Sequence, residues 1–75
     1  DVKPVTIPSN IKQIASNAFN NCLNLEKVEF QENCELNSIC KMAFTNTSIE
    51  KIIIPKQVTE IGQFAFYQCK NLKLL

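Results

Sequence analysis

Four cysteines carry the most reactive side chains of this 75-residue chain, and their spacing bears on metal and disulfide chemistry. They form no Cys-x-x-Cys pair and the chain has no histidine, so no metal site is expected. Cys22 and Cys69 occupy equivalent places in a repeated segment, two copies apart. Stacked strands about 4.8 Å apart would separate them by about 9.6 Å, beyond the limit of about 7 Å between disulfide Cα atoms. We expect both to be reduced, small, buried side chains. Cys34 and Cys40 lie closer in sequence, and the sequence does not decide whether they form a disulfide.

The remaining polar residues do not form a recognisable catalytic set. The chain has a single glycine and scattered carboxylates, so it lacks a phosphate-binding loop, a nucleophile with a base and a pair of matched acids. We therefore predict no catalytic residues, no cofactor and no enzymatic activity. Asn46-Thr47-Ser48 matches the acceptor pattern for N-glycosylation, which matters only in a secreted eukaryotic protein.

Composition excludes several classes of partner. Eight Lys and Arg residues nearly balance seven Asp and Glu residues, so no strong field would attract nucleic acid or an anionic membrane. No apolar run approaches the roughly 20 residues of a membrane-spanning helix, so we expect no membrane insertion in this segment. An apolar share of 45% is normal for a folded domain, and the length allows one small domain.

The elements that must position these residues recur along the chain. An Ala-Phe pair ends at Phe19, Phe44 and Phe66, and the copies resemble one another around it. The predicted repeats, called units 1 to 3, span residues 2–24, 25–48 and 49–71, and a fourth begins at 72–75. Since one such unit is too short to bury its own apolar side chains, we expect the units to stack.

Each unit opens with a short stretch of alternating apolar residues that predicts a strand with one buried face. If equivalent strands pair in parallel, their inward side chains form two columns. The first column contains Val5, Val28, Ile52 and Leu75, and the second contains Ile7, Phe30 and Ile54.

The Ala-Phe segments are predicted to lie on the far side of each unit. The chain must first turn back, near Ile14, Ile39 and Ile61. The spacing of Ile14, Ala18 and Phe19 places their side chains on one face of a helical turn, which predicts a short helical segment in each unit. The three phenylalanines should then stack as a ladder in the core.

Unit 2 departs from the other two. Between its strand and its turn-back residue it has five residues, 31–35, where the flanking units have three, 8–10 and 55–57. Thr47 also replaces the repeated cysteine. Insertions in a repeat map to a loop on one face, so residues 32–35 are a candidate for a binding element.

The pattern that is almost complete from Ile49 to Asn71, with Ile-Pro, Ile-Gly, Ala-Phe and a following Cys, resembles the BspA-like class of leucine-rich repeats. The resemblance covers essentially the whole chain, with departures at Ala15, Cys40 and Thr47. It implies an α/β fold: a right-handed solenoid of about three 23–24-residue repeats, with a parallel β-sheet on the concave side and short helical segments on the convex side. It also implies protein binding in cell adhesion, in a cell-surface or secreted protein, with an extracellular-matrix or host protein as a possible ligand.

The outward residues of the strands define the candidate protein-binding face, Lys27, Glu29, Lys51 and Ile53. Concave sheet faces of solenoids commonly bind partners, although a merely solvated face is the simpler reading. A structural spacer, or a unit that associates end to end through its uncapped ends, is the alternative function.

Overall fold

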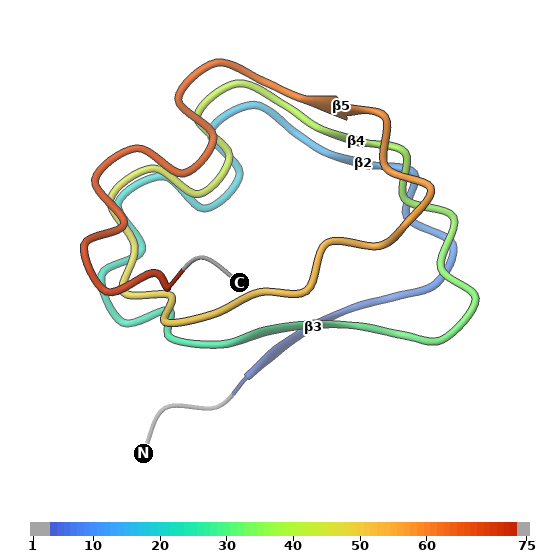
Figure 1. The fold of residues 1–75 in the computed structure, drawn as a ribbon, viewed down its shortest axis with the longest axis horizontal. Helices are drawn as coiled ribbons and strands as arrows, with labels where there is room; N and C mark the ends of the chain where they lie inside the picture. The colour runs from blue at the N-terminus through green and yellow to red at the C-terminus, as the bar shows by residue number, and fades with distance from the viewer. Residues whose placement is uncertain (1–3, 74–75) are drawn as a thin grey trace.

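The computed structural model describes residues 4–73, so Val2, Leu74 and Leu75 of the predicted repeats lie outside the described residues. Within this range the chain makes successive turns that lie on one another, with short strands on two sides of the first two turns and on one side of the third (Figure 1). The strands form two separate parallel sheets. One sheet belongs to the predicted strands and the other to the predicted turn-back segments.

The first sheet pairs β1 (Val5–Ile7) with β3 (Val28–Phe30) in parallel. Val5 lies opposite Val28 and Ile7 opposite Phe30, as the alternating pattern predicts. Ile7 and Val28 are buried, whereas Thr6 and Glu29 between the inward residues are exposed. The apolar alternation therefore set both the strand pairing and the buried face.

The prediction of a third strand in this sheet is wrong. Unit 3 contributes only an isolated parallel bridge between Lys51 and Lys27, and residues 52–55 form no strand. Ile52 and Ile54 still pack against the core as half-buried side chains. The alternating pattern therefore predicts the burial of these side chains even where no strand forms, because side-chain packing does not depend on hydrogen bonding between strands.

The second sheet contains three two-residue strands, β2 (Gln13–Ile14), β4 (Ser38–Ile39) and β5 (Glu60–Ile61), in the order β2-β4-β5. Ile14 pairs with Ile39 and Ile39 with Ile61 in parallel register. The sequence indicates apolar turn-back residues here but not a sheet. Two residues are too few to show an alternating pattern, so the sequence does not predict this sheet.

The short helical segments predicted around the Ala-Phe pairs are also wrong, because residues 4–73 contain no helix. In unit 1, Asn17 and Asn21 adopt left-handed backbone angles, with φ of 62° and 63°. A left-handed residue stops a helix, so two of them four positions apart leave only turns. The same two places are left-handed in the later units, at Met42 and Asn46 and at Phe64 and Gln68.

Backbone hydrogen bonds of these turns run between units instead of along a helix. The Phe19 N–H donates to the Ala43 carbonyl and the Phe44 N–H to the Ala65 carbonyl, both at 2.8 Å. Each turn is thus tied to the next one in the stack. No described residue belongs to a helix long and apolar enough to cross a membrane.

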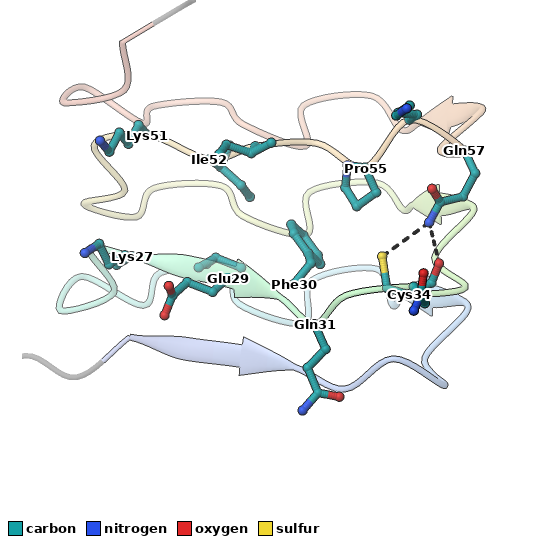
Figure 2. A pocket seen from close by; sticks show the side chains of 13 residues that line it. Lys27, Glu29, Phe30, Gln31, Cys34, Lys51, Ile52, Pro55 and Gln57 are labelled. Atoms are coloured by element: carbon teal, nitrogen blue, oxygen red, sulfur yellow. Dashed lines mark hydrogen bonds between the residues drawn. The ribbon is translucent and has the colours of Figure 1, made fainter.

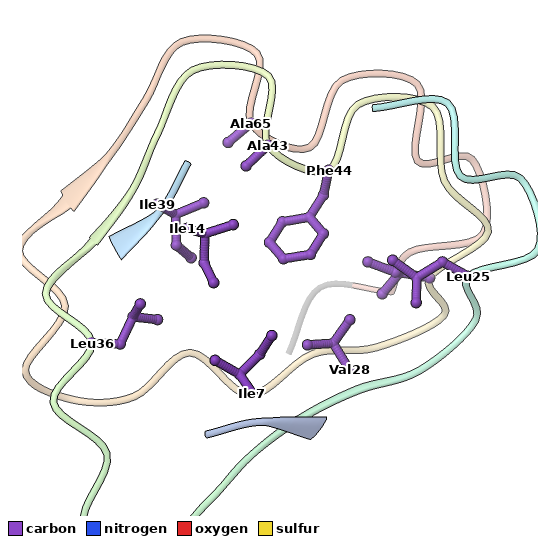
Figure 3. Close-up of a cluster of buried hydrophobic side chains, with 10 residues drawn as sticks. Ile7, Ile14, Leu25, Val28, Leu36, Ile39, Ala43, Phe44 and Ala65 are labelled. Atoms are coloured by element: carbon purple, nitrogen blue, oxygen red, sulfur yellow. The ribbon is translucent and has the colours of Figure 1, made fainter. Parts of the chain in front are cut away.

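The predicted ladder of phenylalanines is confirmed. The ring centroids of Phe19 and Phe44 are 5.2 Å apart with planes inclined by 3°, and those of Phe44 and Phe66 are 5.4 Å apart with planes inclined by 8°. The Phe44 side chain is fully buried, among isoleucines of both sheets, Ala43 of its own turn and Ala65 of the next turn (Figure 3). The ladder therefore forms the centre of the core.

The backbones of units 2 and 3 approach each other closely at Gly62. A Cβ atom added there would lie 2.4 Å from the Lys41 nitrogen and 2.7 Å from the Cys40 carbonyl carbon. The Gly62 N–H donates to the Ile39 carbonyl at 2.7 Å. The glycine is therefore needed for close packing of the two turns, and the backbone there is not left-handed.

Candidate functional site

The four residues of the predicted binding face lie together on one side of the molecule. Lys27 and Glu29 come from unit 2, Lys51 and Ile53 come from unit 3, and all four are exposed. Ile53 is 78% exposed, although isoleucine is among the residues most often buried. The same four side chains line one pocket of about 660 Å³ (Figure 2), which we call the inter-unit groove.

The inter-unit groove opens where the backbone pairing between units 2 and 3 is interrupted. Pairing stops at the bridge between Lys27 and Lys51 and resumes where the Thr59 N–H donates to the Asn37 carbonyl at 2.9 Å. Unit 2 covers this interval with two more residues than unit 3, because its insertion lies at residues 31–35. The two chain segments therefore cannot stay in register across it, and they separate.

A side chain bridges the far end of the gap. The Gln57 amide nitrogen donates to the Cys34 carbonyl at 2.6 Å and lies 3.2 Å from the Cys34 sulfur. Figure 2 shows this contact at one end of the inter-unit groove and the two lysines at the other. The hydrogen bond from the Gln57 side chain thus replaces part of the backbone pairing that is lost at the insertion.

The walls of the inter-unit groove combine apolar surface with excess positive charge. Val28 is buried and Phe30, Ile52 and Pro55 are half-buried, so apolar side chains form its deeper part. The charged lining residues are three lysines and one glutamate, Lys27, Lys51, Lys56 and Glu29. The surface therefore suits a partner with apolar groups and a net negative charge.

Sequence reasoning found only part of this lining. Lys56 and Gln57 were not among the predicted site residues, although the mismatch in length between residues 31–35 and 55–57 signals their position. Of the predicted binding element, residues 32–35, Asn33 and Cys34 line the inter-unit groove and Glu32 and Glu35 do not. The insertion contributes mainly by opening the groove.

All four cysteines are free thiols in this structure. Cys22 is exposed rather than buried as predicted. Cys69 is half-buried, and its sulfur lies 3.0 Å from the Phe44 carbonyl and 3.3 Å from the Thr47 hydroxyl. Thr47, which replaces the repeated cysteine in unit 2, is buried and makes a polar contact between units.

Residues 4–73 contain no cluster of three or more metal-ligating side chains.

The side chain of Asn46, in the glycosylation pattern, takes part in the stacking of units. Its amide nitrogen donates to the Asn21 side-chain oxygen at 2.7 Å. The two asparagines are equivalent left-handed residues of neighbouring units. A glycan would be attached to the same nitrogen, so in this structure that atom already serves a contact between the turns.

The parallel register, the stacked phenylalanines and the recurring turns define a leucine-rich repeat protein. Residues 1–75 match the family described as BspA type Leucine rich repeat region (6 copies). The chain belongs to this BspA-type leucine-rich repeat family.

One solved structure is similar over most of the chain. It is the crystal structure of a leucine rich cell surface protein from Faecalibacterium prausnitzii, with a TM-score of 0.87 and 36% sequence identity over 93% of this chain. The matched region is 18% of that protein's chain. No curated protein matches this chain significantly.

Proposed function

We propose that this chain is a non-enzymatic protein-binding module of a cell-surface or secreted adhesion protein. In this proposal the module is a segment of a right-handed solenoid of about three repeats, and a host or extracellular-matrix protein is its ligand. The observation that carries it is the meeting of four exposed side chains, Lys27, Glu29, Lys51 and Ile53, around one open groove. The similarity to a leucine rich cell surface protein supports the location.

Binding of purified matrix proteins to the immobilised chain tests this proposal. We expect at least one of a panel of such proteins to bind, and the Ile53→Asp variant to lose that binding. Leu23→Asp is the matched control, since Leu23 is also a strongly exposed aliphatic residue, 61% exposed, but does not line the inter-unit groove. Equal loss in both variants, or no binding by any panel member, would reject the proposal.

A second candidate function, end-to-end association, has its own support in the hydrogen bonds of the turns. In unit 2 the N–H groups of Met42, Phe44 and Asn46 donate to unit 3. The equivalent N–H groups of unit 3 have no acceptor among residues 4–73; they are those of Phe64, Phe66 and Gln68. Within residues 4–73, one end of the stack therefore presents a row of donors that have no acceptor in this range.

The opposite end presents the matching acceptors. The carbonyls of Lys41, Ala43 and Thr45 accept from unit 1, whereas the equivalent carbonyls of Ser16, Ala18 and Asn20 accept no hydrogen bond from residues 4–73. Donors at one end and acceptors at the other permit head-to-tail contact between copies. Light scattering over a range of concentrations tests this: growing oligomers support assembly, and a monomer at every concentration contradicts it.

A further inference from the structure

The edge of β3 that faces the inter-unit groove is open. The Lys27 carbonyl accepts from the Val5 N–H at 3.0 Å and the Gln31 N–H donates to the Ile7 carbonyl at 3.2 Å, so the backbone groups of these odd-numbered residues face β1. Because successive residues of a strand direct their backbone groups to opposite sides, those of Phe30 face unit 3. Within the described residues, no backbone hydrogen bond joins residues 30–36 to unit 3.

An unusual charge pair lies at one end of this open edge. Lys27 and Lys51 are partners in the isolated parallel bridge, both are exposed, and neither forms an ion pair with a carboxylate among residues 4–73. Like charges directly opposite one another in a sheet are unfavourable. A carboxylate placed between or above the two ammonium groups would remove this repulsion.

These two features point to the same occupant, and we propose that the inter-unit groove binds an extended acidic segment of a partner protein. The segment adds to the open edge of β3 as a strand, exchanges hydrogen bonds with the Phe30 backbone, and places a carboxylate at Lys27 and Lys51. Addition of a strand to an open sheet edge is an established mode of peptide recognition. This inference rests on the proposed protein-binding function and specifies how the partner is recognised.

The lining of the inter-unit groove agrees with such an occupant. Its volume of about 660 Å³ lies in the range of about 300–1,000 Å³ that pockets for bound molecules occupy. Alternate side chains of a bound strand point to opposite faces. One set would contact Phe30, Ile52 and Pro55 in the deeper part, and the other would remain exposed beside Ile53. An apolar-polar alternation with an acidic end is therefore the expected sequence of the ligand.

A synthetic peptide supplies the test. The probe is a capped heptapeptide of alternating Val and Thr with Asp at both ends, and its control carries Lys at both ends. We expect fluorescence anisotropy to detect binding of the acidic probe only. Methylation of alternate backbone nitrogens gives two further probes, one of which loses the donors that face β3. We expect only one of the two methylated probes to lose binding, since alternate N–H groups face opposite sides.

Variants of the protein test the charge requirement. Lys51→Glu should weaken binding of the acidic probe by roughly tenfold or more, which corresponds to about 1.4 kcal/mol. Lys70→Glu makes the same change in net charge at an exposed residue outside the inter-unit groove and should leave binding nearly unchanged. Circular dichroism of both variants confirms that the fold is kept.

Protection of a thiol locates the peptide. Cys34 lines the inter-unit groove, while Cys22 is exposed and does not line it. The bound acidic probe should slow alkylation of Cys34 but not of Cys22, as read by mass spectrometry. Binding without protection of Cys34, equal binding of the two end-charge probes, or no binding of any probe would overturn the inference. Matrix-protein binding that depends on Ile53 but not on Lys51 would leave the proposed function standing while rejecting this mode of recognition.

Discussion

The rings of Phe44 and Phe66 lie 5.4 Å apart and within 8° of parallel, although 22 positions separate the two residues in sequence. Phe19 lies on the other side of Phe44 at 5.2 Å, so the middle ring contacts one equivalent ring on each side. This relationship joins the units through one continuous core contact. Loss of the middle ring should therefore affect the whole chain rather than one unit.

Phe44→Ala is expected to abolish cooperative thermal unfolding. Truncation of a buried phenylalanine typically costs about 3–5 kcal/mol, a large part of the stability of a small domain. Differential scanning calorimetry checks this expectation. Leu23→Ala is the control because that side chain is 61% exposed, and it should keep a sharp transition. A sharp Phe44→Ala transition near the original midpoint would contradict the role of the ladder.

Gly62→Ala should destabilise the chain by about 1–3 kcal/mol, the usual range for overpacking a close contact. The added Cβ would meet the backbone nitrogen of Lys41 at 2.4 Å, and a backbone atom cannot move aside as a flexible side chain can. Urea unfolding measures the change. Ala15→Ser is the control at the equivalent, exposed position of unit 1. Equal stability of Gly62→Ala and the original chain would show that the turns can separate without cost.

Asn46→Ala should be less stable than Asn46→Gly by about 1 kcal/mol, because alanine is strained at a left-handed φ of 58° and glycine is not. Both variants lose the hydrogen bond to Asn21, so their difference isolates the backbone effect. Thermal unfolding followed by circular dichroism measures it. At Asn10, which is not left-handed, the alanine variant should be at least as stable as the glycine variant. The same order at both sites would be evidence against the left-handed turn.

A thiol titration of unfolded protein without reductant should find four free cysteines. The structure has four free thiols, and Cys22 and Cys69 are too far apart in the stack to pair. In the folded protein the exposed Cys22 should react before the half-buried Cys69. Two or fewer titratable thiols in the unfolded chain would establish a disulfide, with Cys34 and Cys40 as the first pair to examine.

Gln57→Ala should increase the rate at which Cys34 is alkylated in the folded protein. The Gln57 amide lies 3.2 Å from the Cys34 sulfur and donates to the Cys34 carbonyl, so its removal exposes the thiol and frees that end of the inter-unit groove. Mass spectrometry after timed alkylation measures the rate. Gln63→Ala, at an exposed glutamine outside the groove, should not change it. An unchanged rate in Gln57→Ala would mean that the bridge does not close the groove.

The sequence alone determined the register of β1 with β3 and the phenylalanine ladder. These follow from spacing, because stacking units with the same apolar pattern brings equivalent residues such as Phe19 and Phe44 into contact whatever the local backbone does.

Only the tertiary structure decided the backbone between those contacts. The Ala-Phe segments became turns because their N–H groups donate to the next unit, and the pattern of Ile14, Ala18 and Phe19 does not distinguish such turns from a helix. Unit 3 contributes only the Lys27–Lys51 bridge to the first sheet, and after that bridge unit 2 has two more residues than unit 3 before pairing resumes. Sequence spacing reveals that insertion, but where the resulting gap opens depends on how both units pack against one core. That packing places Lys27, Phe30, Lys51 and Gln57 around the inter-unit groove.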